Sequence, residues 1–262
     1  MSELFSIQLQ NRQQQGRDGV WLDLPTTTEQ VQAALRQIGI SSDNPQGLFI
    51  SGYFAEEEKR FAIPYNMVLA SNVDELNFLA ARLETLSAGE RAELNAALQA
   101  PQSELSSIGK ITDFPENVEY YVYLPDVRGP AQLGDYYLNR SGMVNMPEEW
   151  KGGIDTAQFG RYVAQQEQGA FTQYGYLVKS GDEWQKVHEG QPVPEEYRVL
   201  SFPVPEVMRD AANIPPPVQP ETEPQKVIPI ILNGKDSAER MKEITDRLET
   251  GIQQLFDSDR YK

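Results

Sequence analysis

The residues that could carry chemistry in this sequence are a single histidine, a run of glutamates and a set of tyrosines. His188 lies between Val187 and Glu189, and no serine or cysteine motif accompanies it that would make it a general base. Cysteine is absent, which excludes a thiolate nucleophile, a disulfide framework and a zinc–thiolate site. We therefore predict that His188 is an exposed strand residue without a catalytic role.

Metal and nucleotide sites are also poorly supported. The run Glu56–Glu58 could bind a divalent cation, but the adjacent Lys59 and Arg60 are more typical of a solvated turn. Gly152 and Gly153 lack the spacing of a dinucleotide-binding loop, and no Walker loop, HExxH motif or EF-hand is present. A metal-dependent hydrolase built on clustered carboxylates remains a remote alternative. We predict a protein that is not an enzyme and that needs no cofactor or metal.

Five tyrosines in the middle of the chain could stack on nucleic-acid bases. Such a site needs surrounding cations, whereas the neighbours here are acidic. The tyrosines are Tyr120, Tyr121, Tyr123, Tyr136 and Tyr137, and the acidic neighbours are Glu116, Glu119, Asp126 and Asp135. We predict a packed core with polar tips and no direct binding of nucleic acid.

The overall charge points to basic partners. The chain has 39 acidic and 23 basic side chains, a net charge of −16 and a pI near 4.5. Such a surface repels nucleic acid and anionic membranes and attracts basic proteins. Residues 211–262 hold 9 acidic and 7 basic side chains, so the acidity belongs to the preceding part. The sequence shows neither a signal peptide nor a membrane span, and we expect a soluble, cytoplasmic protein.

The pattern of apolar residues predicts an α+β protein with three small domains. Residues 1–60 should form a small β-sheet plus helix domain, with strands over 4–9, 20–24 and 47–54 and a helix capped by Thr26 and Glu29. Residues 61–110 should form a helical bundle, with capping boxes at Asn72 and Ser87 and a short helix over 103–108.

Residues 111–205 should form an α+β domain. We predict strands over 118–124 and 197–202, a helix over 131–139, and a hairpin of 171–179 with 183–188. Glu148 and Glu149 follow Pro147 in a first helical turn, and Asp155 with Gln158 has the spacing of a helix cap. A packing face is expected from Trp150, Ile154, Phe159 and Tyr162.

Beyond residue 205 the chain changes character. Residues 206–230 are rich in proline and predict an extended linker. Residues 231–262 predict an amphipathic helical tail with Met241, Ile244, Leu248, Ile252 and Leu255 on one stripe. This tail resembles the start of the N-terminal, single-strand-DNA-binding domain of ArdC-like proteins.

The preceding body resembles a family of antirestriction proteins. The segments GVWLDLP, NVDELNFLAARLETLSAGERAEL, GDYYLNRSG and IDTAQFGR occur in order between Phe5 and about Lys179, and together they are similar to the ArdA family of conjugative plasmids and transposons. The last segment resembles the antirestriction motif of that family. Its matching residues are Ile154, Asp155, Phe159, Gly160 and Arg161.

The resemblance implies an acidic DNA mimic that binds and inhibits type I restriction–modification enzymes in place of DNA. It also implies an elongated protomer that forms a homodimer through its third domain. We expect the partner-binding surface to be distributed over Asp74, Glu75, Glu84, Glu90, Glu93, Glu116, Glu119, Asp126, Asp135, Glu148 and Glu149. The alternative is an acidic interaction module of a mobile genetic element that recruits a basic DNA-processing partner.

Overall fold

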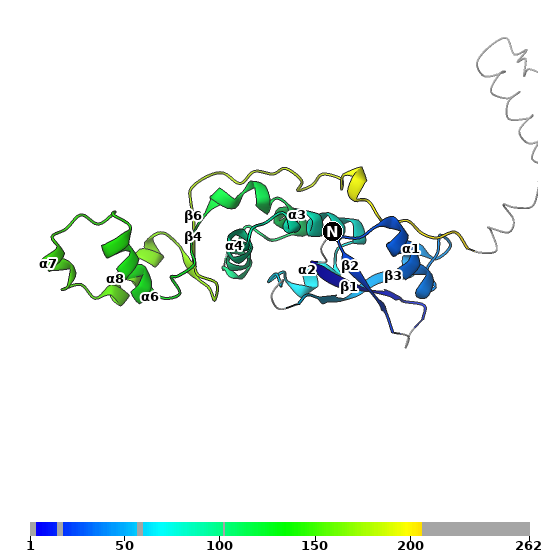
Figure 1. The fold of residues 1–262 in the computed structure, drawn as a ribbon, viewed down its shortest axis with the longest axis horizontal. Coiled ribbons are helices and arrows are strands. Elements are labelled where there is room, and N and C mark those ends of the chain that lie inside the picture. The colour runs from blue at the N-terminus through cyan, green and yellow to red at the C-terminus, as the bar shows by residue number, and fades with distance from the viewer. Residues whose placement is uncertain (1–3, 15–17, 57–59, 102, 206–262) are drawn as a thin grey trace, which may run out of the picture. The chain divides into compact units, whose positions relative to one another are not determined.

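The computed structural model describes residues 4–14, 18–56, 60–101 and 103–205 (Figure 1). The chain divides into two compact units, residues 1–211 and 212–262, and all of the described residues belong to the first unit. The predicted linker (206–230) and helical tail (231–262) lie outside the described residues. Helices and strands are both present, which confirms the α+β class.

The first sheet is antiparallel and has the strand order β2-β1-β3. Its strands are β1 (Phe5–Asn11), β2 (Val20–Leu24) and β3 (Leu48–Phe54), drawn in blue to cyan in Figure 1. Alternate residues of β1 are buried, among them Ile7 and Leu9, so one face of the sheet enters the core. A bulge between Gln8 and Leu9 shifts the register with β3.

Helix α1 (Thr28–Gln37) begins one residue later than the sequence predicted. Its capping box is formed by Thr27 and Gln30, not by Thr26 and Glu29. The cause is a tertiary contact, because Thr26 is buried and its N–H donates to Asn77 Oδ1 over 2.7 Å.

A short 3-10 turn, η1 (Pro45–Gly47), precedes β3. The helices that follow the first sheet are α2 (Tyr65–Leu69), α3 (Val73–Glu84), α4 (Ala88–Gln99) and α5 (Ile108–Thr112). The capping boxes predicted at Asn72 and Ser87 are confirmed, since each side chain accepts from the third residue of its helix. The predicted helix over 103–108 is wrong. Ser107 caps α5 by accepting from the N–H of Lys110, so the helix starts at Ile108.

The second sheet has the order β4-β6-β5, with β4 (Tyr121–Leu124), β5 (Ala170–Phe171) and β6 (Tyr176–Lys179). Residues 118–120 form a 3-10 turn, η4 (Val118–Tyr120), after η3 (Phe114–Glu116), so the predicted strand is shorter than expected. Helix α6 (Pro130–Asp135) continues into the π-helix η5 (Tyr136–Arg140), and α7 (Glu148–Lys151) and α8 (Thr156–Gln166) follow.

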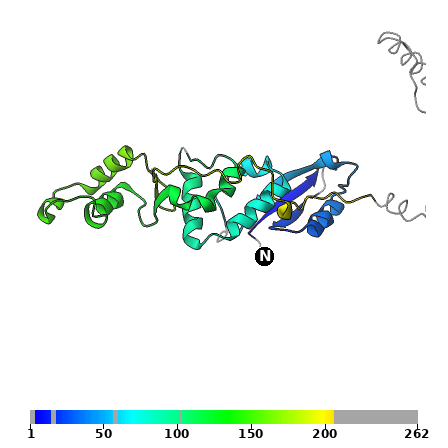
Figure 2. The same cartoon turned by 90° about the horizontal axis from the view of Figure 1, so that it is seen from above.

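Two predicted strands are absent from the described part of the chain, namely 183–188 and 197–202. The hairpin turns instead at Thr172–Gly175, and β6 is already flanked by β4 and β5, so no edge is left for residues 183–188. Residues 181–205, which we call the strap, run without strand pairing and contain one 3-10 turn, η6 (Glu195–Tyr197). The strap is the yellow-green to yellow segment of Figures 1 and 2.

The apolar residues form two cores. The larger core joins residues of the first sheet and of α1, α3, α4 and α5 to Tyr121 and Leu177 of the second sheet. The smaller core contains Val127, Leu133, Ala164 and Tyr176 and lies between α6, α8 and the second sheet. The smaller core therefore includes residues of α8, the helix that begins within the predicted antirestriction motif.

Because Thr27 caps α1, replacing Thr27 with alanine should destabilise the protein more than replacing the adjacent Thr28. Thr27→Ala removes the cap and should lower the free energy of unfolding by about 1 kcal/mol. Thr28→Ala is the matched control, because the Thr28 side chain makes no cap hydrogen bond, and it should change stability by less than about 0.5 kcal/mol. Urea denaturation followed by circular dichroism measures both values. Equal losses in the two variants would contradict the assignment.

Candidate functional site

The predicted motif forms the beginning of α8. Asp155 is its N-cap, and Asp155 Oδ1 accepts from the N–H of Gln158 over 2.9 Å, as the spacing predicted. Ile154 and Phe159 are half-buried, Gly160 is buried and Arg161 is exposed. The motif is therefore a capped helical turn with two exposed charged residues, Asp155 and Arg161, and it contains no serine or cysteine nucleophile.

Gly160 has a definite structural role, because α8 crosses α6 there with their backbones in contact. A Cβ atom on Gly160 would lie 1.9 Å from the carbonyl oxygen of Pro130. A Cβ atom on Gly134 of α6 would lie 1.9 Å from the carbonyl oxygen of Thr156. Neither distance is sterically possible, so both positions require glycine. The motif located Gly160, and Gly134 begins the segment GDYYLNRSG that carries part of the resemblance, but the sequence did not predict that the two glycines meet.

The other end of α8 is fixed by a carboxylate. Glu167 accepts hydrogen bonds from the hydroxyl groups of Tyr137 and Tyr176, which belong to the π-helix and to β6. Burial, reinforced by these bonds, raises the pKa of both tyrosines. Tyr120 and Tyr121 are buried and the other three predicted tyrosines are half-buried, which confirms the packed core. The hydroxyls of Tyr123 and Tyr137 are hydrogen-bonded, whereas that of Tyr121 is buried without a partner among the described residues.

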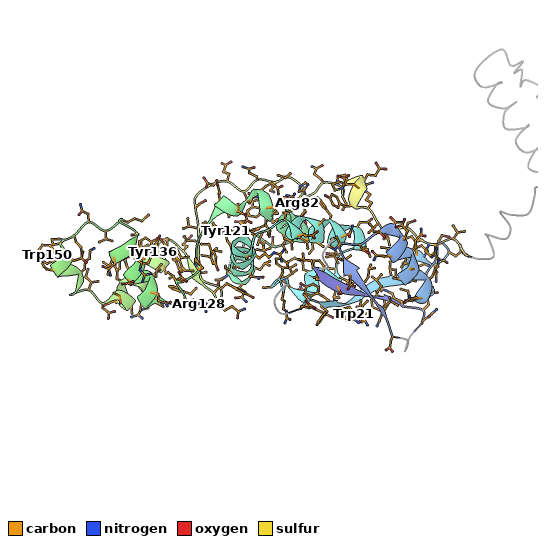
Figure 3. All side chains as sticks on the ribbon, viewed as in Figure 1. Trp21, Arg82, Tyr121, Arg128, Tyr136 and Trp150 are labelled. Atoms are coloured by element: carbon orange, nitrogen blue, oxygen red, sulfur yellow. The ribbon has the colours of Figure 1, made fainter. Side chains whose placement is uncertain are left out.

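The apolar surface near the motif is exposed. Met143, Trp150 and Tyr162 have exposed fractions of 76%, 68% and 60%, and Figure 3 shows Trp150 on α7. The prediction that Trp150 and Tyr162 belong to a packing face is thus wrong for the single chain, because both side chains are exposed. Ile154 and Phe159 are half-buried, as a packing role requires.

The eleven predicted acidic residues differ in exposure. Glu116, Glu119, Asp126, Glu148 and Glu149 are exposed, and Asp74, Glu75, Glu84, Glu90, Glu93 and Asp135 are half-buried. Several are held by the fold. Glu75 and Glu90 complete capping boxes, and Asp74 Oδ1 accepts from the N–H groups of Val199 and Leu200 over 2.8 and 2.7 Å. These carboxylates therefore have defined positions on helices.

Three of the predicted carboxylates have cationic neighbours. Glu116 pairs with Arg82, Asp135 with Arg140 at 3.0 Å, and Glu148 with Lys151 at 2.9 Å. No ion pair within 4.0 Å is found among the described residues for Glu119, Asp126 or Glu149. These three exposed groups are consequently the least compensated negative charges of the predicted set.

Glu93 differs from the other members of the set because its Oε1 atom is buried and has no hydrogen-bond partner among the described residues. Burial, together with the neighbouring Glu90 carboxylate, raises the pKa of Glu93 to about 7. Near neutral pH this group is thus only partly ionised, so it adds less negative charge than the sequence suggests.

Two acidic residues that sequence analysis missed are central to the structure. Asp113 is fully buried and accepts three backbone N–H groups of the strap. Glu104 accepts from Lys179 over 2.6 Å, lies 3.7 Å from Lys110, and has a lowered pKa, chiefly because of the bond from Lys179. Both contacts join residues about 75 positions apart, which local patterns do not reveal.

A cleft of about 1140 Å³ lies between the start of α3, the start of α5 and strap residues 188–193. His188 lies on its wall with its ring 5.0 Å from the ring of Phe78, in an edge-to-face contact. The prediction of an exposed strand histidine is therefore wrong, since His188 is half-buried and lies outside any strand. No serine hydroxyl is bonded to it among the described residues, and no group of His, Asp or Glu there is placed to hold a metal ion.

A comparison with family models gives one match that fits this geometry. The model of the antirestriction protein (ArdA) family matches residues 15–178, which is more than half of the chain. The chain belongs to the ArdA family. No curated protein matches the sequence. Antirestriction is therefore the function of the family, and the expected resemblance is confirmed.

The ArdA match has a clear relation to the fold. It ends within β6 and includes α8 with Gly160 and α6 with Gly134, the two glycines at which these helices cross. The strap begins after its last matched residue. Within the described ranges, no helix has the length and apolar character needed to cross a membrane.

The glycine crossing predicts a strong position dependence for alanine. Gly160→Ala should lower the free energy of unfolding by about 2–3 kcal/mol, because the helices must separate to admit the methyl group. Gly152→Ala is the control, since a Cβ atom there has nothing within 4 Å, and we expect a change below about 0.5 kcal/mol. Thermal and urea unfolding provide the measurement. A Gly160→Ala protein as stable as the control would rule out the close crossing.

The raised pKa of Glu93 predicts a pH-dependent stability. A carboxyl group with a higher pKa in the folded than in the unfolded state stabilises folding when protonated, so its contribution is lost as the pH rises from 4.5 to about 7. Glu93→Gln should raise the melting temperature relative to the parent at pH 8 and change it little at pH 4. Glu119→Gln, at an exposed position, should show no such difference. If Glu93→Gln shifted the melting temperature equally at pH 4 and pH 8, the raised pKa of Glu93 would be disproved.

Proposed function

We propose that this protein inhibits type I restriction–modification enzymes by occupying their DNA-binding cleft as an acidic DNA mimic. Duplex DNA carries one negative charge per about 1.7 Å of its axis, and the enzymes that bind it present lysine and arginine. A protein that places carboxylates on a folded surface can bind such a cleft without catalysis. Membership of the ArdA family, together with the net charge of −16, supports this proposal.

The observation that carries the proposal is the way in which the acidic side chains are fixed. Glu75 and Glu90 are held in capping boxes at helix N-termini, and Asp74 is bonded to strap N–H groups. Fixed carboxylates lose less conformational entropy on binding than carboxylates on mobile loops. The exposed Glu119, Asp126 and Glu149 form no ion pair within 4.0 Å in the described part of the chain, so their charge is available to a partner.

The proposal includes three domains and a dimer. We infer an elongated protomer with domains at 1–60, 61–110 and 111–205, and a homodimer formed through the third domain. The exposed side chains of Met143, Trp150 and Tyr162 support this contact, because large apolar side chains that are exposed in one protomer can be buried when two protomers associate. We place the protein in the cytoplasm, where it meets the restriction enzyme, and we assign it to a mobile genetic element such as a conjugative transposon.

Inhibition should be strong at low salt and weaken as salt is added, because exposed charges are screened. The test uses the purified full chain, a type I enzyme and DNA that contains its recognition site. We expect DNA cleavage to be blocked at 50 mM NaCl and to recover by 300 mM NaCl, with an enzyme-only reaction at each salt concentration as the control. Absence of inhibition at every salt concentration would refute the proposal, and the recruitment of a basic DNA-processing partner would then be the alternative.

The distribution of charge predicts small individual effects and a larger combined one. The triple substitution Glu119→Gln, Asp126→Asn and Glu149→Gln should weaken inhibition about tenfold, at about 0.5 kcal/mol for each exposed charge. Glu221→Gln, Glu223→Gln and Asp236→Asn together change the net charge equally outside the ArdA match and form the control. Titration of cleavage activity with each protein gives the comparison. Equal losses in both triple variants would indicate that only net charge matters.

A further inference from the structure

The strap is held at its first anchor by a buried carboxylate. Asp113 has no exposed surface, and its two oxygens accept from the N–H groups of Val187, His188 and Glu189 over 3.3, 2.6 and 3.2 Å. Asn117 lies next to it and exchanges two hydrogen bonds with the backbone of Gln185. These two side chains of the body bind strap backbone and so hold it independently of its side chains.

A second anchor lies on α3. The amide of Asn77 donates to the carbonyl oxygen of Tyr197 over 3.0 Å, and Asp74 accepts from the N–H groups of Val199 and Leu200. Between the two anchors the strap passes over the cleft, where Gly190 has a φ of +76°. The strap is thus attached at separate points and is not bonded continuously like a strand in a sheet.

A third anchor joins the strap to α1 and to the segment that follows α1. The amide of Gln32 in α1 donates to the Ser201 hydroxyl over 3.1 Å, and the N–H of Ser42 donates to the carbonyl oxygen of Pro203 over 3.1 Å. The strap therefore starts two residues after the end of β6 and contacts, in order, the end of α5, the N-terminal half of α3, and α1. It connects elements that are far apart in the sequence.

Apolar contacts support the same path. Val199 is buried in the larger core, and Trp184, Leu200 and Phe202 are partly buried against it. Tyr197 contacts the ring of Phe78 at a centroid distance of 4.8 Å. The residues that receive the strap, namely Asp74, Asn77, Asp113 and Asn117, all lie inside the ArdA match, whereas the strap lies after it.

We propose that the strap is a latch that keeps α1, α3, α5 and the second sheet in one fixed arrangement, and that inhibition depends on the latched state. This inference rests on the proposed function, because the positions of the carboxylates affect inhibition only if a restriction enzyme binds the acidic surface. Releasing the strap leaves both sheets and α3 folded and lets the acidic elements change their spacing. The latch acts by holding these elements, not through its own charges.

The release variant is Val199→Pro in the full chain. Proline removes one of the two N–H groups that donate to Asp74, and the preceding Arg198 has an extended conformation, φ −79° and ψ 103°, which a following proline favours. The matched control is Val204→Pro, since Val204 is 49% exposed and its N–H has no hydrogen-bond partner within the described residues. Hydrogen exchange read by mass spectrometry reports the strap separately from the body.

We expect Val199→Pro to increase exchange at least tenfold in residues 181–205, to leave β1 and α3 protected, and to weaken inhibition at least fivefold. Val204→Pro should change neither measurement by more than about twofold. Loss of protection throughout β1 and α3 would overturn the proposal, because the strap would then be an integral part of the core. Strap release with unchanged inhibition would overturn it as well.

A disulfide provides a second, independent variant. Because the chain has no cysteine, Gln32→Cys with Ser201→Cys introduces one possible intramolecular bond at the third anchor, and thiol titration verifies that this bond has formed before inhibition is measured. In the Val199→Pro background, oxidation should restore inhibition to within about twofold of the parent, and reduction should remove this rescue. No difference between the oxidised and reduced forms would count against the latch.

The role of the strap's own charge is tested by Glu195→Gln with Glu196→Gln, two exposed strap residues. We expect inhibition to change by less than about twofold, and a loss as large as that of Val199→Pro would overturn the holding role. Failure of the parent protein to inhibit at any salt would refute the proposed function alone. Hydrogen exchange would still show whether the strap opens independently of the body.

Discussion

A shortage of cations constrains this structure throughout. With 39 acidic and 23 basic side chains, many carboxylates cannot be paired with lysine or arginine. The fold satisfies several of them with backbone N–H groups, which carry partial positive charge and are pre-positioned at helix N-termini and turns. Glu75, Glu90 and Asp155 use helix termini, and Asp74 and Asp113 use the strap. This solution keeps the net charge high and fixes the side chains that carry it.

The same constraint separates two kinds of acidic residue. Asp113 and Glu167 are bonded by several donors and act within the fold, where they join segments distant in sequence. Glu119, Asp126 and Glu149 are exposed and leave their charge available to a partner. Glu93 belongs to neither group, because burial without a donor raises its pKa toward neutrality. Charge counted from the sequence therefore overstates the charge that the surface presents.

Local features were predictable from the sequence, and long-range ones were not. The capping boxes at Asn72 and Ser87 need only residues within one helical turn, and the structure confirms both. The cap of α1 was misplaced because a distant side chain, Asn77, takes the N–H of Thr26. Residues 183–188 and 197–202 of the strap were predicted to be strands, but side chains of the body accept hydrogen bonds from N–H groups that a sheet would use. The motif located α8 and the segment GDYYLNRSG included Gly134, whereas the contact between Gly134 and Gly160 could not be predicted from either segment.

The contact between Gly134 and Gly160 has a consequence for the evolution of this family. Because each position is closed to a side chain by the backbone of the opposite helix, neither glycine can drift alone. A lineage that acquires a larger residue at one of them must move the two helices apart and refill the small core around Leu133 and Ala164. Family members whose acidic surfaces differ widely should therefore keep both glycines. Members in which both positions have changed together should pack α6 and α8 differently.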